Sequence, residues 1–402
     1  VDGKTGTPTT QTAGKTFMAT CYGTDAWYNI TSTNALVRFS CDDPYDRYSG
    51  NNYIDLSLTS GTTYYPALLR TVNDSVNGTL WATKVEGTIG GVVRSSTSTV
   101  KLMPNSDDNK LQILFPGETA VPGKWDVSPN GKDGAPQPLT AGISFTFTVN
   151  SIDNQWNKII ENVSGVSVET TDPNDAPITG QNLTNGAKQI THQFITRGVW
   201  KSTASVGGYT SDYSPYITVV SSGATKLLAL LPGESWAEGT SSGKSGTPTQ
   251  QNVNVQFIVT VRSVDPNCNF VNTATHTIKV TTNDKYDADA APNNLVLDAG
   301  QRDFNIKLFT AQQSSVTAQT VGVYYSTLTL SNYTSTEFLC VSSAPVKLQV
   351  VAPGETAVPG SDSGYTGEAS TRTAGAPFVA TVNLVDLMWN VTTAYAPIVS
   401  VD

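Results

Sequence analysis

The sequence predicts an all-β protein built from tandem β-sandwiches that are arranged as an elongated rod. Three observations support this fold class. A sequence motif that ends in Pro-Gly-Glu recurs along the chain. An alternating apolar segment that is closed by Asp-x-x-x-Asn recurs in phase with it. In addition, 33 glycines and 21 prolines supply many turns. Such repetition is typical of a chain in which one module is copied, and a period of roughly 120 residues fits a single sandwich.

The Pro-Gly-Glu motif predicts the first strand of a module. It occupies residues 111–118 and returns at residues 227–234 and 348–355. Apolar residues precede the Pro-Gly turn, as expected of a strand that ends there. The glutamates Glu118, Glu234 and Glu355 have no partner carboxylate at a fixed spacing, so we expect them to lock the turn or pair with a lysine, and not to act as general acids.

A second strand and its closing turn recur four times. The alternating segments, such as residues 145–149, have the period of a half-buried strand. The turns that close them run from Asp25 to Asn29, Asp153 to Asn157, Asp265 to Asn269 and Asp386 to Asn390. Aspartate and asparagine form turns through side-chain hydrogen bonds to the backbone. Trp27, Trp156 and Trp389 lie inside three of the four turns.

The second repeat gives the predicted strand order of one module. Strands are expected at residues 110–115, 144–149, 163–169, 188–196, 200–206 and 216–220. Short strands separated by regular turn signals favour an immunoglobulin-like (Ig-like) sandwich, although the Cys-Trp-Cys pattern of antibody domains is absent. Linkers such as residues 346–348 are very short, so we expect stiff joints and a rod well over about 100 Å long.

Four modules follow from the repeat boundaries. Residues 1–108 form a module that lacks its first strand, residues 109–224 and 225–345 form complete modules, and residues 346–402 begin a fourth that is incomplete or is completed by a neighbouring chain. Two explanations stay open. Either the chain is part of a longer array of such modules, or a strand such as residues 347–352 completes the first module of a neighbouring chain and builds a head-to-tail filament.

The four cysteines fall as two pairs, each inside a single repeat. Cys21 lies with Cys41, and Cys268 lies with Cys340. Because a rod holds its first and third modules apart, these pairings are the predicted disulfides, and they imply an oxidising, extracellular location. The alternative is a set of buried, reduced cysteines, since Cys21 takes the strand position that Val149 has in the next repeat.

Aspartate-rich loops are the only metal candidates, and the ion would be calcium. The residues concerned are Asp42, Asp43, Asp46, Asp172, Asp175, Asp284 and Asp287. Carboxylates at this density can supply the roughly 6 to 8 oxygen ligands of Ca²⁺, but no EF-hand loop is present and aspartate is an ordinary turn former. Solvated turns are therefore the favoured interpretation. We expect no other cofactor and no catalytic residue, because the two histidines, His192 and His276, are too few for a multi-histidine zinc site or a repeated triad.

Charge and sequons bear on possible partners. A net charge of -9 disfavours binding to the negatively charged backbone of nucleic acid. No apolar run reaches the roughly 20 residues that are needed to span a bilayer. Candidate glycosylation sites occur at Asn29, Asn73, Asn77, Asn162, Asn182, Asn332 and Asn390. The predicted partner is a second copy of the chain in a head-to-tail homopolymer, with other surface proteins or glycans as further candidates.

These motifs together resemble a known class of repeats. The strand ending in Asp-x-x-x-Asn, the apolar-Pro-Gly-Glu-Thr opening and the loop Gly3-Lys-Thr-Gly-Thr-Pro8 are similar to the Ig-like repeats of very large prokaryotic cell-surface proteins, and more loosely to the bacterial Ig-like modules of invasin- and intimin-type adhesins. The resemblance covers the whole chain. It implies the architecture, whereas such modules serve as stalks, adhesins, sheath proteins and filament subunits.

The sequence thus predicts an extracellular structural protein and not an enzyme. The favoured hypothesis is a subunit of a cell-surface filament or sheath held together by Ig-like modules and intermolecular β-strand contacts. The alternative is a rigid stalk or adhesin fragment of a longer surface protein that binds a host or carbohydrate ligand.

Overall fold

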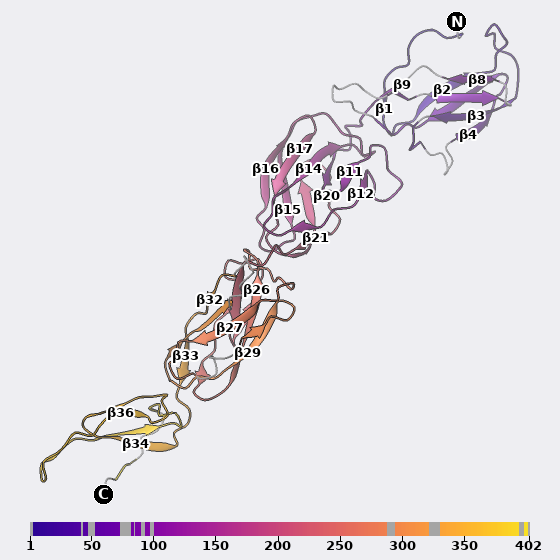
Figure 1. The fold of residues 1–402 in the computed structure, drawn as a ribbon. Helices are drawn as coiled ribbons and strands as arrows, with labels where there is room; N and C mark the ends of the chain where they lie inside the picture. The colour runs from indigo at the N-terminus through magenta and orange to yellow at the C-terminus, as the bar shows by residue number, and fades with distance from the viewer. Residues whose placement is uncertain are drawn as a thin grey trace. The chain divides into compact units, whose positions relative to one another are not determined.

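The computed structural model describes residues 3–41, 43–46, 53–72, 82–83, 85–89, 93–96, 100–287, 294–320, 330–393 and 398–400. Every regular element in these ranges is a β-strand, which confirms the all-β fold class (Figure 1). The chain divides into two compact units. The first comprises Val1–Leu139, Ser144–Phe194 and Gly198–Val219, and the second comprises Thr140–Ile143, Ile195–Arg197 and Val220–Asp402.

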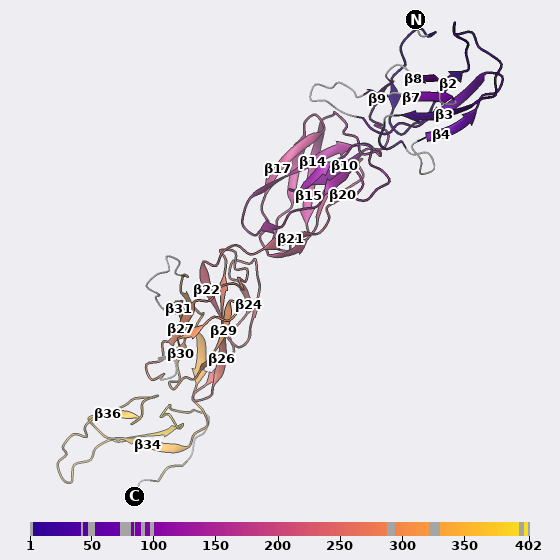
Figure 2. The same ribbon diagram turned by 45° about the vertical axis from the view of Figure 1, so that its right-hand side comes forward.

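The second sandwich, in the first unit, shows the sheets of one full module (Figure 2). One layer has the order β10-β14-β17, and the facing layer has the order β16-β15-β19-β20. The strands are β10 (Lys110–Leu114), β14 (Phe145–Ile152), β15 (Val163–Thr170), β16 (Ile178–Leu183), β17 (Ala187–His192), β19 (Ser202–Ser205) and β20 (Asp212–Tyr213). A hairpin and a small third sheet complete it, formed by β11 (Glu118–Ala120) with β12 (Lys132–Gly134), and by β13 (Leu139–Thr140), β18 (Gly198–Trp200) and β21 (Ile217–Val220).

The strand β14 illustrates why this sequence folds as a sandwich. Its side chains alternate, so that Phe147 and Val149 are buried whereas Thr146 is exposed. Burial of alternate side chains is the signature of a strand with one face on a core. Phe147 stacks on Phe115, which follows the neighbouring strand β10, with ring centroids 5.1 Å apart.

All six predicted strands of this repeat exist, and their bounds differ by a few residues. The strand expected at 200–206 is split into β18 and β19. Sequence reasoning missed β16, β20 and the short strands β11, β12 and β13. These have few apolar residues and pair at sheet edges or in hairpins, so their burial patterns carry little periodicity.

The first sandwich, also in the first unit, has a four-stranded layer with the order β4-β3-β7-β8 and a two-stranded layer, β2-β5, in the part of the chain that the structure describes. A third sheet has the order β1-β9-β6. The strands are β1 (Gln11–Thr12), β2 (Phe17–Tyr22), β3 (Leu36–Cys41), β4 (Tyr53–Ser57), β5 (Thr62–Ala67), β6 (Ala82–Thr83), β7 (Val85–Ile89), β8 (Val93–Ser96) and β9 (Val100–Met103).

The third sandwich, in the second unit, repeats the pattern of the second. Its layers have the orders β22-β26-β29 and β28-β27-β31-β32, with a third sheet β25-β33-β30 and a hairpin β23-β24. The strands are β22 (Lys226–Leu230), β23 (Glu234–Trp236), β24 (Lys244–Gly246), β25 (Gln251–Asn252), β26 (Phe257–Val264), β27 (Thr277–Thr282), β28 (Leu295–Val296), β29 (Gln301–Ile306), β30 (Gln313–Ser314), β31 (Val316–Thr320), β32 (Tyr333–Thr334) and β33 (Phe338–Val341).

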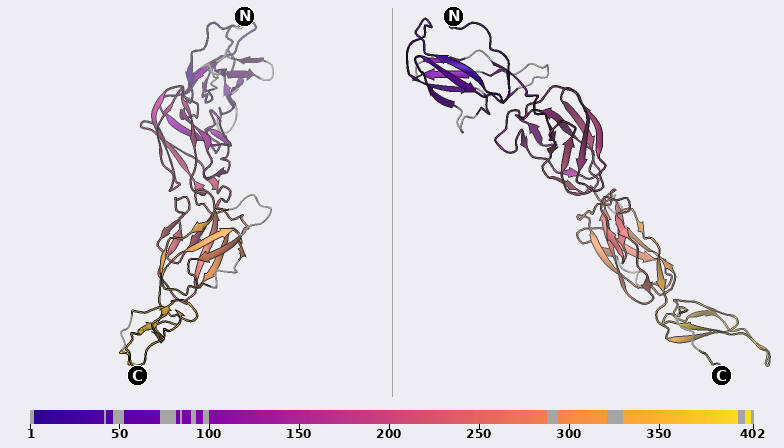
Figure 3. Two further views of the ribbon diagram at one scale, coloured as in Figure 1. Left: turned by 60° about the vertical axis from the view of Figure 1, so that its left-hand side comes forward. Right: turned by 180° about the vertical axis from the view of Figure 1, so that it is seen from behind.

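The last segment of the second unit has fewer strands among the described residues. β34 (Lys347–Val351) pairs with β37 (Thr381–Val385), and β35 (Glu355–Ala357) pairs with β36 (Tyr365–Gly367). Figure 3 shows this yellow segment as a thin layer, in contrast to the fuller orange sandwich. Apolar side chains on it face solvent, since Val350 is 63% exposed and Val379 is 84% exposed.

Of the strands that correspond to β14, two have a sheet partner on one side only in the described chain, β2 and β37. β2 pairs with β5, whereas its counterparts β14 and β26 each lie between two strands. β37 likewise pairs with β34. An unpaired edge leaves backbone N–H and C=O groups without a ladder partner.

The structure does not support the two predicted disulfides, because all four cysteines are free thiols. Cys21 and Cys41 both pack against the core cluster that includes Phe39 and Tyr65, and each is half-buried with a free thiol. Cys268 lies in the turn after β26, and Cys340 lies within β33 in the core. The alternative of buried, reduced cysteines fits Cys268 and Cys340, which are 3% and 1% exposed.

Candidate functional site

The candidate site is the Asp-x-x-x-Asn turn, which the sequence singled out as a repeated element. In the second sandwich the turn follows β14 and is locked by its aspartate. Asp153 Oδ1 accepts hydrogen bonds from the N–H groups of Gln155 and Asn157, both at 2.8 Å. The fourth residue, Trp156, has a left-handed φ of 66°. Its ring packs on Gly131, where a Cβ would lie 2.2 Å from the indole.

This turn binds the end of the first sandwich, inside the first unit. Asn157 Oδ1 accepts a hydrogen bond of 2.7 Å from the Val72 N–H, and Asn157 Nδ2 donates one of 2.8 Å to the Arg70 carbonyl. Asp153 Oδ2 accepts a third, of 2.9 Å, from the Asn105 N–H. Residues 70–72 follow β5 and Asn105 follows β9. The turn thus gathers two strand ends of the preceding sandwich through their backbone groups.

The second unit repeats these three bonds at the turn of the third sandwich. The Arg197 N–H donates to Asn269 Oδ1 at 3.0 Å, and Asn269 Nδ2 donates to the Ile195 carbonyl at 2.9 Å. The Ser222 N–H donates to Asp265 Oδ2 at 3.1 Å. The register of donor and acceptor is the same as in the first unit.

The fourth turn, also in the second unit, binds the end of the third sandwich in the same way. The Ala311 N–H donates to Asn390 Oδ1 at 2.8 Å, and Asn390 Nδ2 donates to the Phe309 carbonyl at 2.9 Å. The Ser343 N–H donates to Asp386 Oδ2 at 3.0 Å. We call this set of three hydrogen bonds the junction. The sequence revealed the turn but not its partner, because the bonded groups of the partner are backbone and leave no residue signature.

Two of the aspartates that the sequence offers as calcium ligands hold the other half of the junction in place. Asp43 Oδ2 accepts hydrogen bonds from the N–H groups of Arg70 and Thr71, and Asp43 Oδ1 accepts one from the Thr71 hydroxyl. Asp284 binds Phe309 and Thr310 with the same atoms. The segment after the strand is therefore hydrogen-bonded to an aspartate of its own sandwich as well as to the junction turn.

The remaining aspartates of these loops also have internal partners. Asp46 accepts from Cys41 Sγ and the Tyr65 hydroxyl, Asp175 pairs with His192, and Asp287 accepts from the Thr282 hydroxyl. Asp43, Asp46, Asp172 and Asp284 are buried, so the expectation of solvated turns is wrong for them. Asp42 lies outside the described residues. Within those residues no cluster of three or more His, Cys, Asp or Glu is arranged to hold a metal, and calcium binding stays a prediction.

The Asp-x-x-x-Asn turn of the first sandwich is less buried than the other three turns. Asp153 and Asn157 have no exposed surface, and burial raises the pKa of Asp153 above its ordinary value against the opposing effect of its hydrogen bonds. Asn29 is exposed and Asp25 is half-buried. The hydrogen bonds from the Asn29 side chain and backbone lower the pKa of Asp25. The same motif thus carries its carboxylate in two different environments.

The recurring glutamates lock their turns, as the sequence predicted. The Oε2 atoms of Glu118, Glu234 and Glu355 accept hydrogen bonds from the N–H groups of Phe115, Leu231 and Ala352. Glu234 also forms an ion pair of 2.6 Å with Lys244, and both side chains are buried. In the last segment Tyr365 takes the position of that lysine. Each of these carboxylates therefore has a structural partner within its own module.

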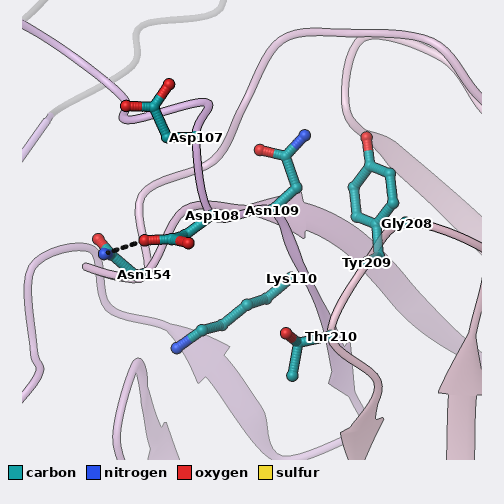
Figure 4. Close-up of a pocket in the computed structure, with 8 residues that line it drawn as sticks. All are labelled: Asp107, Asp108, Asn109, Lys110, Asn154, Gly208, Tyr209 and Thr210. Carbon is teal, nitrogen blue, oxygen red and sulfur yellow. Dashed lines mark hydrogen bonds between the residues drawn. The ribbon is translucent and has the colours of Figure 1, made fainter.

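A polar cleft of about 430 Å³ lies in the first unit beside β10 (Figure 4). Its lining consists of Asp107, Asp108, Asn109, Lys110, Asn154, Gly208, Tyr209 and Thr210. The acidic groups already have partners, because Asp107 pairs with Lys15 and Asp108 accepts a hydrogen bond from Asn154. The cleft therefore presents no unengaged acid and base at hydrogen-bond distance from each other.

The predicted glycosylation sites differ in access. Asn29, Asn162, Asn182 and Asn332 are exposed. Asn390 is 1% exposed and is bound in a junction, so the folded chain offers it no room for a glycan. Asn73 and Asn77 lie outside the described residues.

The sequence matches no known family and no curated protein. Similar solved structures include invasin, a bacterial integrin-binding protein (13% identity, 87% of this chain, 60% of that chain, TM-score 0.24), and the Escherichia coli adhesin FdeC (13%, 83%, 95%, TM-score 0.27). Another is a β-glucuronidase from Bacteroides uniformis (13%, 57%, 25%, TM-score 0.19), of which the chain spans a quarter. In the described chain no helix is long and apolar enough to cross a membrane.

Proposed function

We propose that this chain is an extracellular structural protein that serves as a subunit of a cell-surface filament or sheath. The observation that carries the structural role is the junction, which recurs with the same atoms at three turns. Each junction joins two strand ends to one buried turn, and buried hydrogen bonds are costly to leave unmade. A force on one module is thereby passed to the backbone of the next.

Association between copies is supported by the open strand edges. β2 has one edge without a strand partner in the described chain, and β34 carries exposed apolar side chains such as Val350. A strand edge of this kind binds a strand from another chain through main-chain hydrogen bonds, with alternate side chains filling the core. The proposal is that β34 of one copy adds to β2 of the next and makes a head-to-tail polymer.

No catalytic activity is part of this proposal. The recurring glutamates are bound in turns, and His192 is bound to Asp175 on the edge of an aromatic cluster. Other surface proteins or glycans are proposed as additional partners, on account of the exposed aromatic residues Tyr64, Tyr213 and Tyr216.

Sedimentation velocity and electron microscopy of the full chain test the filament. We expect polymers whose amount rises with concentration, and Val350→Asp is expected to reduce them because it puts a charge on the donor strand. Val255→Asp is the matched control, since Val255 is also an exposed valine but lies in the third sandwich. A monomeric chain at all concentrations contradicts the filament.

The second candidate is a stalk or adhesin fragment of a longer surface protein. The junction supports the stalk as much as the filament, because stiff joints suit a stalk that holds a ligand-binding end away from the cell. It predicts a monomer that binds host cells or a glycan array. Sedimentation together with a binding measurement on the same preparation separates the two candidates.

A further inference from the structure

The turn of the first repeat has the internal geometry of a junction turn. Asp25 Oδ1 accepts hydrogen bonds of 2.9 Å from the N–H groups of Trp27 and Asn29. Asn29 Nδ2 donates to Asp25 Oδ2 at 2.9 Å, as Asn157 Nδ2 does to Asp153 Oδ2 at 3.0 Å. Tyr28 has a φ of 64°, which matches the 66° of Trp156. The turn is therefore preformed.

The outward-facing acceptors of this turn bind no N–H group of another segment in the described chain. In the three other turns the asparagine Oδ1 and the aspartate Oδ2 each bind an N–H group of a preceding segment within the same unit. Asn29 Oδ1 and Asp25 Oδ2 have no such bond among the described residues, and Asn29 is exposed. The lowered pKa of Asp25 keeps its carboxylate ionised and ready to accept.

A large aromatic side chain flanks these acceptors. Trp27 is 81% exposed and stands at the position of Gln155, Asn267 and Met388 in the other turns. Those three residues all contact a preceding segment within their own unit. Gln155 accepts a hydrogen bond from Arg70, Asn267 Nδ2 lies 2.7 Å from the place of a Cβ on Gly142, and Met388 packs against the core of the third sandwich. An exposed indole at a contact position is typical of an interface anchor.

We propose that the face formed by Asp25, Trp27 and Asn29 is a docking site for the end of a further Ig-like module of this repeat type. The partner must offer a carbonyl and, two residues later, an N–H group after one strand, together with an N–H group after its last strand. A second copy of this chain is a poor source of these backbone groups. Its complete modules already use those groups, at Arg70 and Val72 and at their two counterparts in the second unit.

The repeat itself allows a direct experiment. Gly243-Lys-Ser-Gly-Thr-Pro248 matches Gly3-Lys-Thr-Gly-Thr-Pro8, so residues 109–242 can be joined ahead of Gly3 at equivalent positions. This long extension supplies both a first strand and a preceding module whose end is known to form a junction. A short extension with residues 225–242 supplies the strand alone and is the matched control.

Oxidative footprinting of Trp27, read by mass spectrometry, is the measurement. We expect labelling of Trp27 to fall at least about fivefold in the long extension and to stay at the level of the unextended chain in the short one. Asp25→Ala together with Asn29→Ala should restore labelling in the long extension. Hydrogen exchange across residues 24–30 should slow in the same samples.

Equal labelling of Trp27 in the long and short extensions overturns the proposal. If the long extension fails to fold, residues 225–363 joined ahead of Gly3 offer a second module end, with Phe309, Ala311 and Ser343 as its donors. Labelling of the unextended chain that falls with protein concentration, and that the Asp25→Ala change prevents, would identify a second copy as the occupant and would also overturn it. The experiment is independent of strand addition between copies, so it and the proposed filament can fail separately.

Discussion

Asn157 Oδ1 lies 2.7 Å from the backbone nitrogen of Val72, so an asparagine in one sandwich satisfies the main chain that follows a strand of the sandwich before it. The two residues are 85 positions apart in the sequence. Both are buried, and the bond is one of three in the junction.

Replacement of Asn157 tests the strength of the junction. Asn157→Ala leaves the Val72 N–H and the Arg70 carbonyl without their partner, and each buried group left unpaired costs about 1 to 3 kcal/mol. We expect a loss of about 2 to 4 kcal/mol in the free energy of local opening, measured by hydrogen exchange in residues 68–72 and in the turn. Asn29→Ala is the matched control, and its exposed position should limit the loss to about 1 kcal/mol or less. Equal losses would contradict the role of the junction.

The two environments of the motif predict opposite responses to pH. Burial raises the folded pKa of Asp153 above the ordinary 3.8, so the folded state keeps a proton that the unfolded state releases. The stability that the neutral form contributes is present below pH 3.8 and is lost as the pH rises through the folded pKa. The pKa of Asp25 is lowered, so its contribution is present above pH 3.8 and is lost as the pH falls through its folded pKa.

Carbon NMR of the two carboxyl groups measures this difference. Asp153 should titrate above 3.8 and Asp25 below it. Asp153→Asn should flatten the pH dependence of local opening near β14 in acid. An Asp153 that titrates below Asp25 would contradict the prediction.

The buried ion pair of the third sandwich gives a second stability test. Glu234→Gln keeps the acceptor for the Leu231 N–H but removes the charge that faces Lys244. An unpaired buried charge costs about 3 to 5 kcal/mol, so hydrogen exchange in β24 and β26 should quicken markedly. Glu355→Gln is the control, because Tyr365 replaces the lysine there. It should change exchange in β35 and β36 by less than about 1 kcal/mol.

Thiol chemistry tests the state of the cysteines. Burial raises the pKa of Cys340 to about 12, and it also raises the pKa of Cys41. Thiols react as thiolates, so we expect alkylation of these residues to be slow in the folded chain and complete after unfolding without a reductant. Mass spectrometry that detects disulfide-linked peptides in freshly secreted material would contradict the free thiols.

Glycan occupancy tests the burial of the fourth turn. Expressed in a secreting eukaryotic cell, the chain should carry glycans at Asn162, Asn182 or Asn332, which are exposed. Asn390 should stay unmodified because the junction encloses it. Glycopeptide mapping decides this, and a glycan on Asn390 would show that the fourth turn opens before it is modified.

The sequence predicted the strands better than the contacts between modules. Periodic apolar residues such as Phe147 and Val149 mark β14 because burial alternates along it. Asp153 and Asn157 were recognised as a turn because their side chains bind their own backbone. Their second role was not predictable, since the groups they bind in the partner are main-chain N–H and C=O. Asp43 was misjudged for a related reason, because its hydrogen-bond partner, Thr71, lies 28 residues away.

Because the junction recognises main chain on one side, the residues at positions 70, 195 and 309 are an arginine, an isoleucine and a phenylalanine without any change in bonding. Gene duplication or recombination can therefore insert, delete or exchange whole repeats without a matching change in the neighbour. The length of such an array is then free to drift between lineages while its joints stay chemically constant.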